Sequence, residues 1–157
     1  MIDVHDSATR TRNMKAIRAK NTRPELKLRS LLHRKGFRFK VCPRDVKGQP
    51  DIWMPKWNCA IFVHGCFWHA HECSLFKWPK TRQEFWKHKL QSNRERDLEV
   101  YKHLVGEGQR VLVVWECAIA GKNSIDEGLL LKLVKTSLVS HLPVGEIDQD
   151  GLRFKEP

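Results

Sequence analysis

The chain has 157 residues, enough for one domain with a substantial core but too few for two. Apolar residues make up 41% and charged residues 30%, which excludes a disordered chain and favours a globular one. The net charge of +11 favours a polyanionic partner, and residues 1–40 alone hold 12 Lys and Arg against 3 Asp and Glu. A solvated cationic surface explains this charge equally well when nothing else is considered.

The N-terminal residues lack the basic and apolar regions of a secretory signal peptide, and no apolar stretch is long enough to cross a bilayer. We therefore expect a cytoplasmic protein with no membrane association, in a compartment where stable disulfides are rare. Its five cysteines then indicate core thiols or metal ligands rather than a disulfide framework.

The first predicted elements are a basic arm and a helix. Residues 1–20 show no apolar stripe, so we interpret them as an arm that becomes ordered against a partner. Thr22 heads a capping box that Glu25 completes, which predicts a helix from this point to Gly36. Apolar and basic residues alternate over residues 37–41 and predict a half-exposed strand.

The middle of the chain is predicted to form two more strands. A Pro/Gly-containing loop leads to a strand at residues 51–53, and residues 59–63 are nearly all apolar, as in a strand buried on both faces. A capping box at residues 81–84 then predicts a long polar helix that ends before Gly106 or Gly108.

The last third is predicted to hold a buried strand at residues 111–115 and a helix that opens with a capping box at 124–127. Residues 143–157 are interpreted as a loose tail. The order of elements predicts a single α/β domain over residues 1–157, with a mixed central sheet flanked by helices.

Metal-binding residue types crowd into residues 64–73, which contain three histidines and two cysteines. Cys66, His71 and Cys73 are close enough for one loop to present all three, and thiolate and imidazole are the ligands that Zn²⁺ prefers. Cys117 follows a buried strand and is our fourth ligand for a structural zinc site. The alternative is two buried cysteines beside surface histidines; we favour zinc because buried thiols need no such neighbours.

A second group of residues suggests catalysis. Asp51 stands at the start of a strand, and Val63 ends the next one, so a hairpin would bring the Asp51 carboxylate and the backbone near Val63 to one site. Carboxylate and carbonyl oxygens suit Mg²⁺, which beside DNA supports phosphodiester cleavage. His64 and His69 remain available as bases near neutral pH. The alternative is that Asp51 only caps a turn and has no catalytic role.

Several runs of residues, in this order and spacing, resemble the very-short-patch repair endonucleases. They are His-Gly-Cys-Phe-Trp-His at 64–69, Thr-Arg-x-x-Phe-Trp at 81–86, Asn-x-x-Arg-Asp at 93–97 and Val-Val-Trp-Glu-Cys-Ala at 113–118. The opening, with His-Asp-Ser-x-Thr-Arg at 5–10 and Asn-Met at 13–14, is similar to the N-terminal arm of that family. The likeness covers about residues 1–120, and its several blocks make it specific.

The resemblance implies a restriction-endonuclease-like fold and an Mg²⁺-dependent DNA endonuclease. Such an enzyme nicks one strand 5′ to the thymine of a T:G mismatch, which arises when 5-methylcytosine is deaminated, and so initiates very-short-patch repair. Asp51 is then the carboxylate ligand of Mg²⁺ and Val63 contributes its backbone carbonyl. His69 is the base. The supporting residues are His64, Asp97 and Glu25. The resemblance also implies zinc at Cys66, His71, Cys73 and Cys117.

Large aromatic residues in hydrophilic segments predict how a mismatch is recognised. Burial is the ordinary explanation for Phe67, Trp68 and Trp86, but two adjacent aromatics in a metal-held loop do not easily share one core. Side chains inserted between base pairs would sense how readily a step unstacks. The resemblance assigns this role to the three residues, with Met14 on the arm approaching from the other groove.

We expect double-stranded DNA with a T:G mismatch and other mismatch-repair proteins as partners of a monomer in the bacterial cytoplasm. Two alternatives remain open. One is a restriction-type nuclease of the same fold with another specificity. The other is a zinc-stabilised DNA-binding protein without catalysis.

Overall fold

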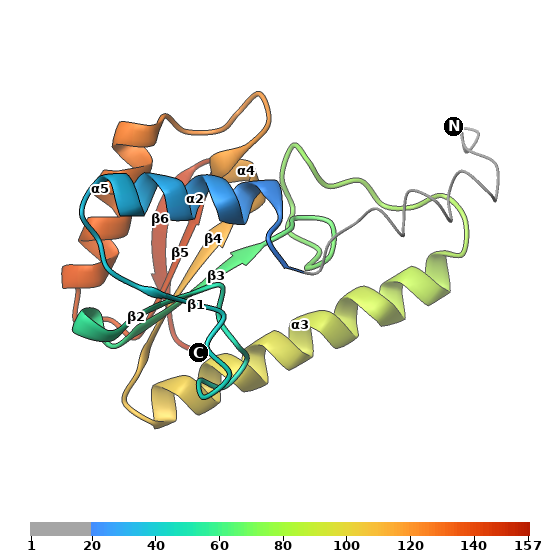
Figure 1. Ribbon diagram of the computed structural model, residues 1–157. Coiled ribbons are helices and arrows are strands. Elements are labelled where there is room, and N and C mark those ends of the chain that lie inside the picture. Colours follow the sequence, from blue (N-terminus) through green and yellow to red (C-terminus); the bar gives the residue numbers. More distant parts are fainter. Residues whose placement is uncertain (1–19) are drawn as a thin grey trace.

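The computed structural model describes residues 20–157; Met14 and nearly all of the predicted basic arm lie outside this range. A six-stranded sheet in the order β1-β2-β3-β4-β5-β6 forms its centre (Figure 1). Three central strands run parallel: β3 (Cys59–His64), β4 (Arg110–Trp115) and β5 (Val144–Asp148). The antiparallel strands are β1 (Lys40–Val41), β2 (Ile52–Met54) and β6 (Gly151–Lys155). The prediction of a mixed central sheet is confirmed.

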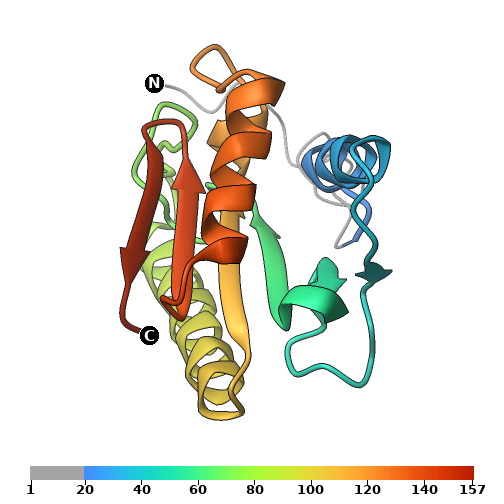
Figure 2. The ribbon, with the colours of Figure 1, turned by 90° about the vertical axis from the view of Figure 1, so that its left-hand side faces the viewer.

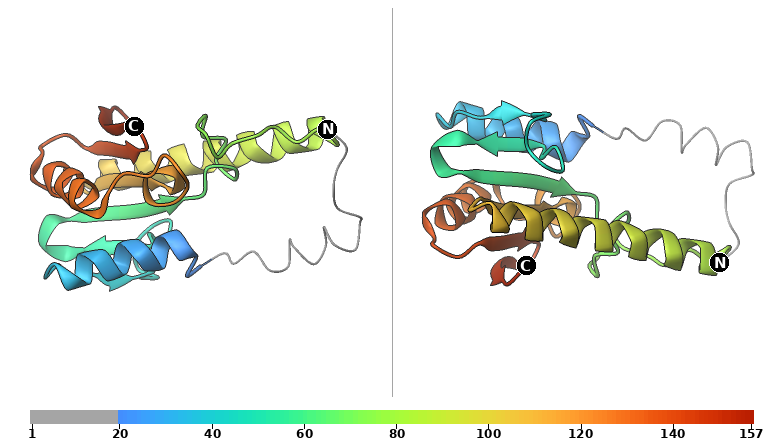
Figure 3. Two further views of the ribbon diagram at one scale, coloured as in Figure 1. Left: turned by 90° about the horizontal axis from the view of Figure 1, so that it is seen from above. Right: turned by 90° about the horizontal axis from the view of Figure 1, so that it is seen from below.

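Helices cover both faces of the sheet. On one face lie α2 (Arg23–Arg34), the short α4 (Glu116–Ile119) and α5 (Glu127–Val139), and on the other lies α3 (Gln83–Gly106). Figure 2 shows α5 alongside the strands, and both views of Figure 3 show α2 and α3 on opposite sides of the sheet. A short 3-10 turn, η1 (Pro55–Trp57), joins β2 to β3.

Successive side chains of β3 point to opposite faces of the sheet and contribute to two separate cores. Ile61 and Val63 pack with α2 and α5, whereas Ala60 and Phe62 pack with residues of α3. All six residues of β3 are buried, as predicted for a strand covered on both faces. The last two residues of β3 therefore serve opposite faces of the sheet, and the loop that follows them begins at the boundary between the two cores.

One of the three predicted capping boxes is confirmed in its Thr22 cap, although Glu25 bonds to the residue before the cap instead of to the Thr22 N–H. Thr22 Oγ1 accepts from the Glu25 backbone N–H at 3.4 Å, and Glu25 Oε2 accepts from the Asn21 N–H at 2.8 Å. The other two boxes are wrong. α3 follows Arg82 in a left-handed conformation without a side-chain cap, and α5 is capped by Asp126, whose carboxylate accepts from the Leu129 N–H at 3.0 Å.

The predicted strand at residues 37–41 is shorter than expected. Only Lys40 and Val41 pair with β2, because Phe37 and Phe39 pack against the core instead of continuing the ladder. Within residues 20–157, no helix has both the length and the apolar composition that a membrane crossing requires.

The interpretation of residues 143–157 as a loose tail is wrong, because these residues form β5 and β6. β5 pairs parallel with β4, and Val144 and Ile147 are fully buried beside it. The chain then turns at Gln149–Asp150, with Gly151 at φ +120°, and β6 returns antiparallel. The segment contains no continuous apolar run because β5 carries Gly145 and Glu146 between its buried residues, so the hydrophobic signal was weak.

Candidate active site and metal cluster

Asp51 lies directly before β2 and is bound to the end of β3. Its Oδ2 accepts from the Val63 backbone N–H at 2.7 Å, so the predicted hairpin does join the two segments. In an extended strand the N–H and C=O of one residue point to the same edge, so the Val63 carbonyl also faces the Asp51 side. Burial raises the pKa of Asp51 to about 6, and the negative charge of Glu25 adds to this rise.

Helix α2 places an ion pair behind Asp51. Arg29 Nη2 and Glu25 Oε2 are 3.3 Å apart on successive turns, and both side chains are almost fully buried. The guanidinium also donates to the Asp51 backbone carbonyl, from Nη2 at 3.0 Å and from Nε at 3.3 Å. Arg29 therefore fixes the backbone of Asp51, whereas Glu25 disfavours the charge on its carboxylate.

His64 lies on the α3 side at the end of β3. Its Nε2 is hydrogen-bonded to the hydroxyl of Tyr101 from α3, and both side chains are buried. Burial holds the pKa of His64 well below its ordinary value, which keeps the imidazole neutral at physiological pH. Burial also raises the pKa of Tyr101, so the phenol retains its proton and can donate it to His64.

The loop after β3 returns His69 to the same place. The His64 and His69 rings stack at 3.8 Å between centroids, and His69 Nδ1 is hydrogen-bonded to Asp97 Oδ2 on α3. His64 Nε2 lies 3.9 Å from the same carboxylate oxygen. A carboxylate at Nδ1 fixes the tautomer in which Nε2 carries the lone pair, and this is the arrangement that a histidine base requires.

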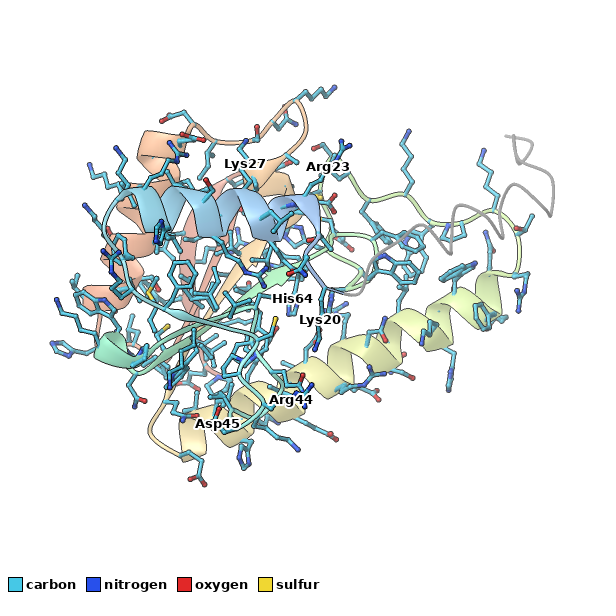
Figure 4. The ribbon with its side chains drawn as sticks, viewed as in Figure 1. Lys20, Arg23, Lys27, Arg44, Asp45 and His64 are labelled. Carbon is cyan, nitrogen blue, oxygen red and sulfur yellow. The ribbon has the colours of Figure 1, made fainter. Side chains whose placement is uncertain are left out.

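Positive side chains lie on two elements near this group. Figure 4 shows His64 at the end of β3, with Lys20, Arg23 and Lys27 on the α2 side and Arg44 on the loop before β2. All four cationic residues are exposed. An anionic polymer approaching this end of the sheet would meet positive charge from both α2 and the β1–β2 loop.

The four predicted metal ligands come together in one compact cluster. The sulfurs of Cys66, Cys73 and Cys117 and a ring nitrogen of His71 all lie within 4.8 Å of one another. A tetrahedral zinc site with bonds of about 2.3 Å to sulfur separates its ligand atoms by about 3.8 Å, so the four residues need little movement to bind one ion. Contacts with Cys66 and His71 lower the pKa of the Cys117 thiol to about 5, which favours the thiolate form.

The two remaining cysteines lie elsewhere. Cys59 is buried within β3, and Cys42 lies before the loop to β2, where its sulfur is 3.4 Å from Arg29 Nη2. Neither belongs to the metal cluster.

The predicted aromatic wedge forms a group of its own outside both cores. The Phe67 ring lies 5.2 Å from Trp68 and 5.3 Å from Trp86, and the two indoles are 6.0 Å apart. All three side chains are partly exposed. Asn93 on α3 donates to the Trp68 carbonyl at 2.9 Å and ties the loop to the helix. Burial in a common core, the alternative explanation, does not describe these residues.

Several residues at these sites were not predicted from the sequence. Tyr101 and Arg29 hold His64 and Asp51 in place, and Asp148 lies 3.3 Å from His71. Trp78 and Phe85 extend the aromatic group and are about half exposed. Tyr101 is the only tyrosine of the chain and follows Asp97 by one helical turn, a spacing that could have placed both on one face.

Known proteins resemble this chain over most of its length. The profile of the DNA mismatch endonuclease Vsr family matches residues 2–75. The DNA mismatch endonuclease Vsr of Escherichia coli (strain K12) is 42% identical over 154 residues, covering 98% of this chain and 99% of that protein. The type II nicking enzyme V.XorIIP of Xanthomonas oryzae pv. oryzae is 44% identical over 116 residues, covering 74% of this chain and 85% of the enzyme. The type II nicking enzyme V.NmeAIP of Neisseria meningitidis serogroup A is 37% identical over 122 residues, with coverage of 78% and 87%.

Proposed function

This chain belongs to the Vsr family of DNA mismatch endonucleases and is a DNA endonuclease, and we propose that it nicks one strand 5′ to the thymine of a T:G mismatch. The observation that carries the proposal is that Asp51 is bound to the Val63 N–H near the end of β3, where the rings of His64 and His69 stack beside a partly exposed aromatic group. Since the chain is an enzyme, the alternative of a zinc-stabilised DNA-binding protein without catalysis is excluded. We infer a restriction-endonuclease-like fold, supported by the mixed sheet flanked by helices and by the place of Asp51 directly before one of its strands.

The donor set at Asp51 suits a hard cation. A buried carboxylate whose charge is opposed by burial and by Glu25 is stabilised by a bound cation, and the Val63 carbonyl offers a second oxygen on the same edge. Asp51 and Val63 would therefore hold Mg²⁺. A bound Mg²⁺ would stabilise the negative charge on the attacked phosphate and on the leaving oxygen.

The histidines supply the proton transfer. His69 Nε2 accepts a proton from the attacking water, while Asp97 holds the opposite nitrogen and stabilises the imidazolium that forms. His64 stays neutral under the ring of His69, and Tyr101 fixes its orientation. Glu25 acts at a distance, through Arg29 and through the charge that it places near Asp51.

Zinc is assigned to Cys66, His71, Cys73 and Cys117, because four thiolate and imidazole donors gather where each can reach one ion. The bound ion would fix the loop that carries His69 and two residues of the aromatic wedge, Phe67 and Trp68, while the third, Trp86, lies on α3. Met14 would approach the mismatch from the arm at residues 1–20. Residues 20–157 share one sheet, which supports a single endonuclease domain. We expect this domain to act as a monomer on DNA in the bacterial cytoplasm. Other mismatch-repair proteins are expected partners.

The test is strand-specific nicking of end-labelled duplexes that differ in one base pair. We expect a single cut, 5′ to the thymine of the T:G duplex, that requires Mg²⁺, and no cut in T:A or C:G duplexes. Equal cleavage of matched and mismatched DNA would instead support the restriction-type nuclease of other specificity. No cleavage of any duplex with Mg²⁺ present would contradict the proposed catalytic site.

A further inference from the structure

We propose that Asp148 orients His71 for metal binding, so that the C-terminal hairpin is a working part of the metal cluster. The proposal rests on the zinc site proposed above. Its evidence is that the two ring nitrogens of His71 have different partners: Nδ1 lies 3.7 Å from Cys117 Sγ, and Nε2 lies 3.3 Å from Asp148 Oδ2. Only Nδ1 faces the cluster, so the carboxylate is placed to hold the proton on Nε2 and leave the lone pair on Nδ1.

The carboxylate is itself fixed. Asp148 is 3% exposed at the end of β5, where its Oδ1 accepts from the Asp150 N–H at 2.8 Å and its Oδ2 accepts from Arg153 Nη2. The hairpin that these bonds close is joined to the sheet because β5 pairs with β4. A buried carboxylate anchored at both oxygens has little freedom to turn away from the imidazole.

Trp115 restricts the same ring in a second direction. Its indole stacks on His71 with 4.2 Å between centroids and 13° between planes, so it fixes the plane of the imidazole. Asp148 then fixes the rotation of the ring within that plane. With both constraints in place, Nδ1 points towards the three sulfurs before any metal binds, and the entropy of ordering this ligand is already lost in folding.

A purely structural role for Asp148 makes a different prediction. If Asp148 served only to close the β5–β6 turn, its loss would weaken the hairpin and leave metal affinity unchanged. Glu146 provides a matched control, because it lies two residues earlier on the same strand and bonds to Lys155 on β6 at 2.8 Å. It has no bond to His71 among the described residues, so its removal costs a hairpin ion pair alone.

The experiment compares zinc affinity in the full-length, zinc-loaded protein by competition with a chromophoric chelator. Asp148→Asn keeps the size of the side chain and an acceptor for Asp150, and we expect it to lower zinc affinity about 10- to 100-fold. Glu146→Gln should remain within about twofold of the unmodified protein, as expected for a pair with one partly exposed member. Unchanged affinity in Asp148→Asn, or an equal loss in Glu146→Gln, would overturn the inference.

A double-mutant cycle tests whether Asp148 acts through the imidazole. In a His71→Cys background the ligand has no second nitrogen, so Asp148→Asn should no longer change zinc affinity. An undiminished effect there would show that Asp148 acts by another route and would contradict the inference.

One measurement needs no substitution and applies even if Asp148→Asn does not fold. Long-range ¹H–¹⁵N NMR of the zinc-loaded chain should show His71 protonated at Nε2 and metal-bound at Nδ1, and the reverse assignment would overturn the inference. If the native protein holds no zinc, the proposed metal site itself is wrong. If it holds one zinc ion that binds Asp148→Asn with full affinity, only the role of Asp148 is wrong.

Discussion

Two clusters share the loop after β3, and they differ in what holds them together. The four ligand atoms of the metal cluster lie within 4.8 Å of one another, and the zinc ion proposed above would join them. The catalytic cluster of His64, His69 and Asp97 is instead held by hydrogen bonds and ring stacking to β3 and α3. On this proposal, one loop takes its shape from a metal ion and holds its catalytic histidine through contacts with the rest of the fold.

Trp115 separates the two clusters. The indole stacks on His71 on the metal side, and its centroid is 5.4 Å from the His64 ring and 6.1 Å from the His69 ring on the catalytic side. It pairs with His64 in the parallel ladder of β3 and β4. Substitutions on the two sides of this residue should therefore have separable effects, and the following predictions test how far that separation holds.

The largest effect on catalysis is expected at Asp51. Asp51→Ala should abolish nicking and leave DNA binding and zinc content unchanged, because the carboxylate would hold Mg²⁺ whereas phosphate contacts would supply the affinity. Single-turnover nicking and a binding titration measure the two effects. Asp45→Ala, an exposed aspartate on the same loop, is the matched control and should nick normally. Near-normal activity of Asp51→Ala would remove Asp51 from the mechanism.

His69→Ala should be the next largest change. Loss of a general base lowers the rate by about 10²- to 10⁴-fold, and hydroxide should restore part of that rate as the pH rises. Zinc content should stay at one ion per chain, because His69 belongs to the catalytic side of the loop. The pH profile of single-turnover nicking checks this prediction, and a profile parallel to that of the unmodified enzyme would count against His69 as the base.

Cys117→Ser should change stability more than any catalytic substitution. It removes one of four metal ligands, so the zinc ion should be lost and the free energy of unfolding should fall by about 3 kcal/mol or more. Cys42→Ser, which changes a cysteine outside the cluster, should retain its zinc. Elemental analysis and thermal melts of the two variants provide the measurement. Zinc absent from the native protein would show that the ligand assignment is wrong.

Trp68→Ala should reduce selectivity rather than chemistry. Loss of one base-stacking contact costs about 1–3 kcal/mol, which corresponds to a loss of about 5- to 100-fold in the preference for T:G over T:A duplexes. The matched control is Trp57 on η1, which packs against the core formed with α2 and α5. Trp57→Ala should keep the preference for T:G duplexes. A lower melting temperature for Trp68→Ala with an unchanged affinity ratio would contradict insertion at the mismatch.

The smallest effect is expected from Tyr101→Phe, which removes one hydroxyl and preserves the packing. His64 Nε2 loses its hydrogen-bond donor, a change of about 1 kcal/mol, so nicking should slow by about fivefold with normal zinc content. The pH dependence of nicking should also shift, because the orientation of His64 beneath His69 is no longer fixed. An unchanged rate and pH profile would mean that Tyr101 contributes packing alone.

Local signals in the sequence predicted what lies close in the chain. Cys66, His71 and Cys73 fall within eight residues, and Cys117 follows a strand whose apolar run marks it as buried beside β3, so the metal cluster was accessible to sequence reasoning. Asp148 was not, because its place beside His71 depends on the parallel pairing of β5 with β4. Because β5 has a mixed polar composition, its sequence does not identify it as a strand. Only the structure shows that it pairs with β4.

The separation of the two clusters is tested most directly by measuring zinc content and single-turnover nicking of T:G DNA on the same preparations of His69→Ala and Cys117→Ser. The account predicts that His69→Ala keeps one zinc ion and an unchanged melting temperature while it loses nicking. It predicts that Cys117→Ser loses zinc, stability and nicking together. Loss of zinc from His69→Ala, or full nicking by zinc-free Cys117→Ser, would contradict it.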